Sequence, residues 1–313
     1  MAVFLAASDE ALGEGVFHHA GYLAPVACWT DFIIPAWEKE VLAGPPLLDE
    51  FHMVDLRSRS WREAHGITRE DVETRIDAAV EILTRAKGLY AVRSSVDGIH
   101  FDEWANGLRF KLNDPRRAPA DFVSDYPSFL GYIYSVLFTC ASYPQAEKVD
   151  FVIEEKKEVF AAIHDFYESV RESLPRIGLS HVAQIMGELT PGDKKRIPLQ
   201  AADILCWHTQ RWTASTRNAA ITFSEVDRER YSKLIRLGSG HTWSREMIEG
   251  LCNSLFEDWR KLNEVEGISE VRSNNEDDSP RRSARSESRD GSGETRTRIG
   301  SAANGQTRTR TAT

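Results

Sequence analysis

The sequence predicts an α/β fold with a mixed sheet flanked by helices. Segments that favour strands alternate with segments of helical spacing along most of the 313 residues. The chain opens with two strand-like segments joined by a glycine-containing turn, which is typical of a hairpin. A composition of 41% hydrophobic and 28% charged residues is that of a globular protein, and it excludes a fibrous or wholly disordered chain.

The first half of the chain supplies the hairpin, two helices and a further strand. Gly13 and Gly15 mark the turn of the hairpin, and the proline-rich sequence after residue 44 ends the first helix. Thr68 and Asp71 form a capping-box pattern at the start of the second helix. The expected elements are strands 2–8 and 16–24, helix 29–42, helix 68–87 and strand 89–96. Phe32, Ile33, Trp37 and Val41 are the expected apolar positions of helix 29–42.

The second half continues the alternation and then becomes helical. Pro198 stands where a proline is favoured, in the first turn of a helix. The expected elements are helix 122–142, strand 148–154, helix 157–173, strand 181–189, and helices 199–212, 224–237 and 244–265. We therefore expect one domain over residues 1–268, with additional helices at its C-terminal end.

Residues 269–313 differ in composition from the rest. They hold nine Arg, no Lys and seven acids among Ser, Asn, Gly and Thr. Such a segment buries too little apolar area to offset its ordering entropy, so we expect a disordered tail. It is either a solvated tail or an Arg-rich arm that contacts nucleic acid.

Charge and hydropathy limit the partners. The net charge of −9 lies in the domain rather than the tail, and this disfavours generic nucleic-acid binding but leaves a local basic groove open. The first residues lack the basic start of a signal peptide, and no apolar run is long enough to cross a bilayer. We expect a cytoplasmic protein without a membrane partner; the oligomeric state stays open.

Asp203 is the most informative residue in the chain. It lies in the sequence Pro-Leu-Gln-Ala-Ala-Asp-Ile-Leu, residues 198–205, on a helix that is expected to be buried almost all round. A buried carboxylate is costly unless it is hydrogen-bonded, paired or bound to a metal. Gln200 and Trp207 are spaced to share its helix face. Asp203 is therefore either a structural group satisfied by the backbone or an Arg, or part of a functional site.

The same segment resembles the hallmark of the domain-of-unknown-function 3800 family, whose members have a ribonuclease H-like fold. The family pattern begins with a strand ending in Asp-Glu-Ser-Gly, a Gly-rich turn and a second strand, and residues 4–24 fit this layout. Glu50-Phe51-His52 matches a later Glu-x-His element, while Glu154 and Glu188 match acids at the ends of two strands.

The resemblance implies a divalent-metal phosphodiesterase, nuclease-like, with nucleic acid as its partner. Mg²⁺ or Mn²⁺ takes oxygen ligands, and two such ions clamp the attacking and leaving oxygens of a phosphodiester. By the resemblance, Glu154, Glu188 and Asp203 are metal ligands, and Asp9 is a further candidate from the turn after the first strand. His52 or Glu50 assists proton transfer or departure of the leaving group.

One departure from the family pattern supports a rival function. The family's first-strand Asp and Glu align with Ala6 and Ala7, which cannot bind a cation. Asp9 and Glu10 follow three residues later, and in a strand a shift of three reverses the face, so we expect that only an irregular backbone lets them substitute. The rival is a catalytically degenerate ribonuclease H-like binding or regulatory module.

The remaining sequence signals are weaker. The basic loop at 192–196 either holds a phosphate near the acids or is a solvated turn, and Arg57, Arg59 and Arg62 are candidates for the same basic rim. The alternation of a strand points His18 and His19 to opposite faces, so a two-His metal site is not expected. No phosphate-binding loop, dinucleotide fingerprint or serine-hydrolase motif is present.

Overall fold

The computed structural model describes residues 2–97, 126–143, 145–155, 160–243 and 246. All of these residues belong to one compact unit, which ends at Trp259. The expected helix at 244–265, the boundary at 268 and the tail at 269–313 lie outside the described residues, apart from residue 246. Within the described residues, no helix has the length and apolar character needed to span a bilayer.

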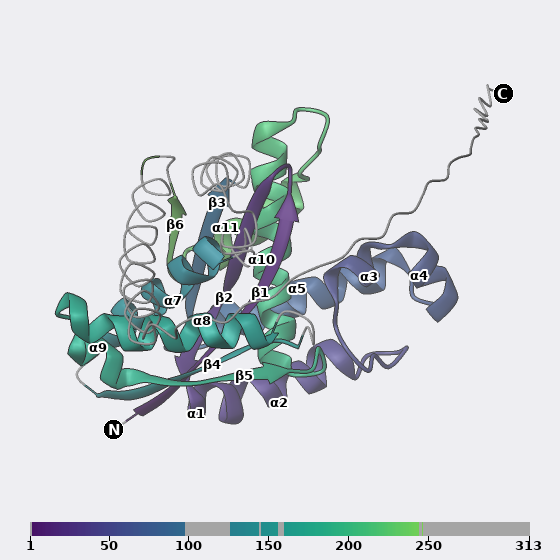
Figure 1. The fold of residues 1–313 in the computed structure, drawn as a ribbon. Helices are drawn as coiled ribbons and strands as arrows, with labels where there is room; N and C mark the ends of the chain where they lie inside the picture. The colour runs from purple at the N-terminus through teal and green to yellow at the C-terminus, as the bar shows by residue number, and fades with distance from the viewer. Residues whose placement is uncertain (1, 98–125, 144, 156–159, 244–245, 247–313) are drawn as a thin grey trace, which may run out of the picture. The chain divides into compact units, whose positions relative to one another are not determined.

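The described strands form one mixed sheet with the order β5-β4-β1-β2-β3-β6, which confirms the expected α/β class (Figure 1). β1 pairs antiparallel with β2, and β2 antiparallel with β3, whereas β4 runs parallel to β1, β5 parallel to β4 and β6 parallel to β3. The strands are β1 Ala2–Gly13, β2 Val16–Pro25, β3 Tyr90–Asp97, β4 Ala146–Glu154, β5 Met186–Gly192 and β6 Ser239–Trp243. Strand β6 was not expected from the sequence.

The hairpin between β1 and β2 is longer than its apolar residues predict. Its turn consists of Glu14 and Gly15, which both have positive φ angles of 51° and 73°. A tight hairpin turn requires this left-handed conformation, because its twist matches that of the strands. The β1–β2 register then continues without a shift from Gly13 back to Phe4. Strand β1 therefore passes beyond Ser8, and Asp9 is a regular strand residue.

One face of the sheet is covered by two long helices and a run of short helical segments. The long helices are α5 Arg69–Arg85, which begins at the predicted Thr68–Asp71 capping box, and α10 Ile197–Arg217. α10 contacts both β1 and β2. The shorter segments are α1 Val26–Cys28, η1 Trp29–Ile33, α2 Ile34–Trp37, η2 Glu38–Leu42, α3 Met53–Arg57, α4 Arg59–His65 and α11 Glu225–Ile235.

The predicted helix at 29–42 contains two π-helical segments, η1 and η2. Its buried positions are Trp29, Ile33, Trp37 and Val41, a regular spacing of four. A π-helical turn contains more residues than an α-helical turn, so side chains four residues apart remain on the face that packs against the core. Phe32, which was expected on the apolar face, is instead among the exposed hydrophobic residues.

The opposite face of the sheet carries α7 Tyr126–Ala141, α8 Phe160–Ser173, η3 Leu174–Ile177 and α9 Ser180–Ile185. A second apolar cluster fills this side, and it includes Ala6, Phe151 and Tyr132. The sheet is thus buried on both sides by helices, so its edges and strand ends are where polar side chains can gather.

The expected strand at 181–189 is wrong in its position. Its first five residues belong to helix α9, and the strand β5 begins only at Met186. Val182 fits a helical as well as a strand pattern, and it is fully buried from the helix. Because β5 is displaced toward the C-terminus, Glu188 is the third residue of the strand instead of standing at its end.

Candidate functional site

Two acids lie side by side where the parallel strands β1 and β4 leave the apolar core. The last pair in their register is Ser8 with Ile153, so Asp9 and Glu154 follow as the next neighbours. Ala7 packs against Leu199 of α10, and in a strand Asp9 shares the face of Ala7. The expected reversal of face over three residues is present, because Ala6 belongs to the apolar cluster on the opposite side. Asp9 nevertheless lies near Glu154 from a regular β1, because it shares the face of Ala7.

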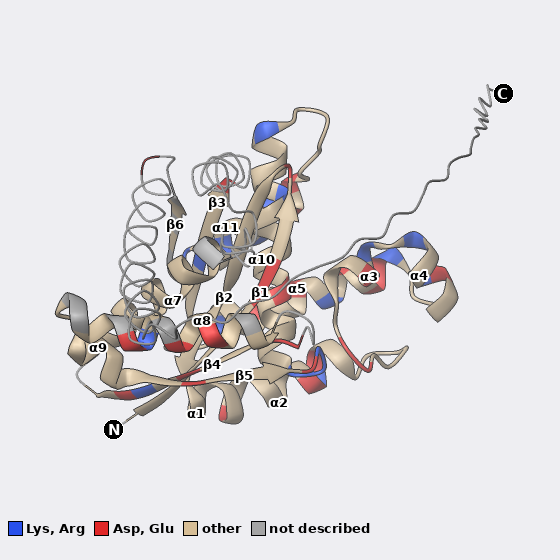
Figure 2. Ribbon diagram, viewed as in Figure 1, with Lys and Arg blue, Asp and Glu red and all other residues tan. Residues whose placement is uncertain are grey.

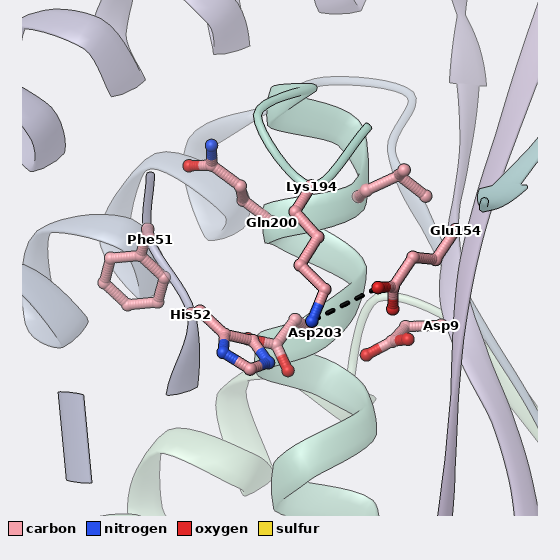
Figure 3. A pocket seen from close by; sticks show the side chains of 8 residues that line it. Asp9, Phe51, His52, Glu154, Lys194, Gln200 and Asp203 are labelled. Atoms are coloured by element: carbon pink, nitrogen blue, oxygen red, sulfur yellow. Dashed lines mark ion pairs between the residues drawn. The ribbon is translucent and has the colours of Figure 1, made fainter. Parts of the chain in front are cut away.

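Helix α10 brings Asp203 to the same place from the facing layer. A small pocket of about 20 Å³ is lined by residues from β1, β4, α10, the segment before α3 and the loop after β5 (Figure 3). Its lining residues are Asp9, Phe51, His52, Glu154, Lys194, Leu199, Gln200 and Asp203. Three carboxylates that lie far apart in the sequence thus line one pocket.

Asp203 is withdrawn from solvent and only partly compensated. Its Oδ2 atom accepts a hydrogen bond of 2.6 Å from the backbone N–H of Met53. Burial, with a smaller contribution from Glu154, raises the pKa of Asp203 to about 6 against the opposing effects of Met53, His52 and Lys194. The carboxylate therefore has fewer favourable partners than its burial requires.

The raised pKa of Asp203 has a consequence for stability with a definite sign. The folded state binds the proton more readily than the unfolded state, whose value is near 3.8. The stabilisation from this proton is complete below that value and is lost as the pH rises through about 6. At neutral pH, the metal-free fold therefore carries the cost of a buried negative charge.

Lys194 supplies the nearest positive charge. Its Nζ atom lies 3.2 Å from Oε1 of Glu154, and the side chain reaches toward Asp203 (Figure 3). Burial lowers the pKa of Lys194, but the hydrogen bond to Glu154 and the charges of Glu154, Asp9 and Asp203 outweigh this effect, so that its pKa is raised. The loop after β5, which the sequence left open as a phosphate-binding loop or a solvated turn, thus places one lysine among the acids.

His52 borders the pocket from the residue before α3. Its Nδ1 atom lies 2.9 Å from Oδ2 of Asp55. When Nδ1 carries the proton and donates a hydrogen bond to Asp55, Nε2 keeps a lone pair that can accept a proton. Figure 3 shows the imidazole beside the carboxylate of Asp203. This arrangement leaves Nε2 available to accept a proton beside the pocket.

Gln200 fixes the loop that carries Lys194. Its Oε1 atom accepts a hydrogen bond of 2.9 Å from Nε1 of Trp37, and its Nε2 donates one of 3.1 Å to the backbone carbonyl of Lys195. Gln200 was expected to share a helix face with Asp203, and both line the pocket. Trp207, the third residue of that expected face, instead lies under the guanidinium of Arg57 at 5.1 Å.

Two expected site residues lie elsewhere. Glu188 lies near the start of β5, where its side chain is exposed and its backbone N–H donates to Oδ1 of Asp150 in β4. The residue of β5 that pairs with Glu154 is Gly192. A Cβ atom at Gly192 would come within 2.7 Å of the Leu199 side chain, so a larger residue there would have to displace that side chain. Glu50 lines a separate hollow of about 370 Å³ together with Trp61 and other residues.

The three arginines after His52 have partners of their own. Arg57 pairs with Glu73 and Asp227, Arg59 pairs with Glu63, and Arg62 donates to the backbone carbonyl of Leu56. Acidic and basic residues accordingly stand together on α3 and α4 (Figure 2). None of the three lines the pocket, so the positive charge near the acids comes from the loop after β5.

The donor chemistry of the pocket fits a hard divalent cation. Asp9, Glu154 and Asp203 offer carboxylate oxygens, the ligands that Mg²⁺ and Mn²⁺ prefer. The burial of Asp203 and the ammonium group of Lys194 at Glu154 likewise indicate a site that attracts cations. Within the described residues, no group of three or more His, Cys, Asp and Glu side chains stands close enough to hold a metal as placed. Binding therefore requires these side chains to close around the ion.

Comparison of the chain with models of known protein families, with curated proteins and with solved structures finds no match. The geometry of the pocket is therefore the basis for a functional proposal.

Proposed function

We propose that the protein is a divalent-metal-dependent phosphodiesterase, nuclease-like, that acts on nucleic acid. The observation that carries the proposal is the convergence of Asp9, Glu154 and Asp203 at one pocket, from two adjacent strands and a facing helix. Buried acids with raised pKa values and uncompensated charge cluster at functional sites more often than elsewhere.

We also propose that the fold is ribonuclease H-like and that the chain resembles the domain-of-unknown-function 3800 family. A ribonuclease H-like sheet has three consecutive antiparallel strands, with two later strands added in parallel beside the first. The order β5-β4-β1-β2-β3 and the strand directions agree with that plan. Fold likeness alone does not define activity, so the site carries the functional part of the proposal.

In this proposal, each residue has a distinct task. Asp9, Glu154 and Asp203 would hold Mg²⁺ or Mn²⁺, which would supply positive charge to the phosphate oxygens and make the attacking water more acidic. Nε2 of His52 takes the proton of the attacking water, and Asp55 stabilises the imidazolium that forms. The water oxygen joins phosphorus as the P–O bond to one ester oxygen breaks, and the leaving oxygen takes a proton from solvent, to which His52 later returns its own.

A catalytically degenerate binding module is the second candidate. The sequence argument for it was the alanine pair at 6 and 7, but Ala6 faces the opposite apolar cluster, and Asp9 supplies an acid on the face of Ala7. The observation that favours this candidate is the ion pair between Lys194 and Glu154, because an internal ammonium group already neutralises part of the site.

The test is hydrolysis of single- and double-stranded DNA and RNA in the presence of Mn²⁺. We expect turnover of at least one of these substrates, with a fall of about a hundredfold or more in Asp9→Asn, Glu154→Gln and Asp203→Asn. Glu188→Gln is the matched control, because it removes an exposed acid outside the pocket and should keep the wild-type rate. Binding of nucleic acid without turnover in Mn²⁺ would favour the degenerate module.

A further inference from the structure

We propose that Lys194 is an internal cation that competes with the divalent metal, so that metal binding is an exchange in which the ammonium group leaves the carboxylates. The inference rests on the proposed function, since it concerns how the same site takes up its metal. It assigns to Lys194 a role that is separate from catalysis: control of the affinity and selectivity of the site for cations.

The position of the ammonium group is the first argument. Nζ of Lys194 is 3.2 Å from Glu154, and Figure 3 shows it between Glu154 and Asp203, with Asp9 beside them. A divalent ion bound by these acids would occupy the same region. Two cations within a few ångströms of each other repel strongly at the reduced dielectric of a protein pocket, so the ammonium and the metal exclude each other.

The remaining space is the second argument. The pocket holds about 20 Å³ with Lys194 in place. A cavity needs about 10–15 Å³ to admit one water molecule. Room is therefore available for about one water, but not for a hydrated ion with a substrate phosphate. Withdrawal of the lysine side chain would open the space that the metal and its remaining waters require.

The loop allows this withdrawal without unfolding. The side chain of Lys194 is 43% exposed, so a rotation about its own bonds can carry the ammonium group to solvent. The backbone around it is held in place: the N–H of Lys195 donates to Oδ1 of Asp193, and Gln200 donates to the carbonyl of Lys195. The exchange therefore needs movements of side chains only, of Lys194 outward and of the carboxylates around the ion, while the loop keeps its conformation.

Lys195 provides a matched control in the same loop. It is exposed, and it lines the neighbouring hollow with Glu50 rather than the carboxylate pocket. Removing its charge changes the net charge of the protein as much as removing that of Lys194. A general electrostatic effect on cation binding would appear in both variants, whereas competition inside the pocket would appear only at Lys194.

The experiment is a calorimetric titration of the full chain with Mn²⁺ alone at neutral pH. We expect Lys194→Met and Lys194→Gln to bind Mn²⁺ at least about tenfold more tightly than the wild type. Lys195→Met should bind as the wild type does, and Lys194→Arg, which keeps the charge, should not show the gain. Circular dichroism without metal establishes that each variant is folded, and the Gln variant serves if the Met variant is not.

The outcomes separate this inference from the proposed function. Wild-type binding of Mn²⁺ with equal or weaker binding by both Lys194 variants would overturn the competition and leave the metal site standing. An equal gain in Lys194→Met and Lys195→Met would overturn it as well, since the effect would then be one of net charge. Absence of binding in the wild type and in both Lys194 variants would overturn the metal-dependent function together with the inference.

Discussion

Asp203 is buried and Asp227 is partly buried, and their pKa values move in opposite directions. The pKa of Asp203 is raised to about 6, chiefly by burial. Burial also acts to raise the pKa of Asp227, but the hydroxyl of Ser224 and the positive charges of Arg57, His208 and Arg230 outweigh it, and its pKa is lowered. The difference lies both in the degree of burial and in the partners, because Asp203 is the more deeply buried and Asp227 lies among arginines.

The surroundings of Asp227 form an ion-pair network that joins three helices. Oδ1 of Asp227 accepts from Arg57 at 2.7 Å and from Arg230 at 3.3 Å, and both arginines also contact Glu73 of α5. Arg230 reaches Asp77 as well, at 2.7 Å. Every buried acid of this network faces a guanidinium group within hydrogen-bonding distance, so the network stabilises the packing of α3 and α11 on α5.

Among the described residues, the pocket around Asp203 has a different balance of lining charges. Asp9, Glu154 and Asp203 converge there with one lysine, which makes its short ion pair with Glu154. The two regions show that a protein can either satisfy buried carboxylates from within the chain or leave negative charge for a ligand to satisfy. We infer that the first arrangement serves the fold and the second serves function.

The largest expected effect is in the network. Arg230→Met removes the partner of three acids from a position that is almost fully buried, and breaking a buried ion pair in this way costs about 3–5 kcal/mol. Urea unfolding at neutral pH measures the loss. Lys233→Met is the control on the same helix, because its exposed pair with Glu229 should contribute about 1 kcal/mol or less. Equal losses of stability in the two variants would contradict a structural role for the network.

The next effect concerns the two aspartates and differs in sign. Without metal at neutral pH, Asp203→Asn should be more stable than the wild type by about 1–3 kcal/mol, because it removes a charge whose pKa is about 6. This gain should vanish as the pH falls toward 4. Asp227→Asn should lose about 1–3 kcal/mol, because it leaves arginines without a charged partner.

Denaturant unfolding across this pH range measures both variants against the wild type. A destabilised Asp203→Asn protein at neutral pH would contradict the comparison, since Asp203 would then be a satisfied structural group like Asp227.

The sequence predicted the hairpin, the alternation of strands and helices, and the burial of Asp203 on its helix, because these depend on local patterns. It misplaced β5, because Val182 fits a helix and a strand equally well and only pairing with β4 decides between them. It ended β1 too early, because polar Ser8 and Asp9 resemble a loop when the partner strand β2 is not considered. Both errors affected the choice of candidate site residues. The first placed Glu188 among them, and the second made Asp9 a weaker candidate than its position warrants.

The role of Lys194 had only a weak signal in the sequence. A basic loop before the helix was visible, but which of its residues reaches the acids depends on where β5 ends and on how Gln200 holds the loop. Gln200 itself carried a better signal, since it stands three residues before Asp203 on a buried helix. Contacts across the sheet and between layers are not local in sequence, and they determine the remainder of the pocket.

The central claim is that the charge of Asp203 is held for a divalent cation. Its most direct test is the free energy of unfolding with and without Mn²⁺ in the wild type, Asp203→Asn and Glu188→Gln. At a hundred times its dissociation constant, Mn²⁺ should stabilise the wild type and Glu188→Gln by about 2.7 kcal/mol, and Asp203→Asn should not respond. An Asp203→Asn protein that gains as much from Mn²⁺ as the wild type would contradict the claim.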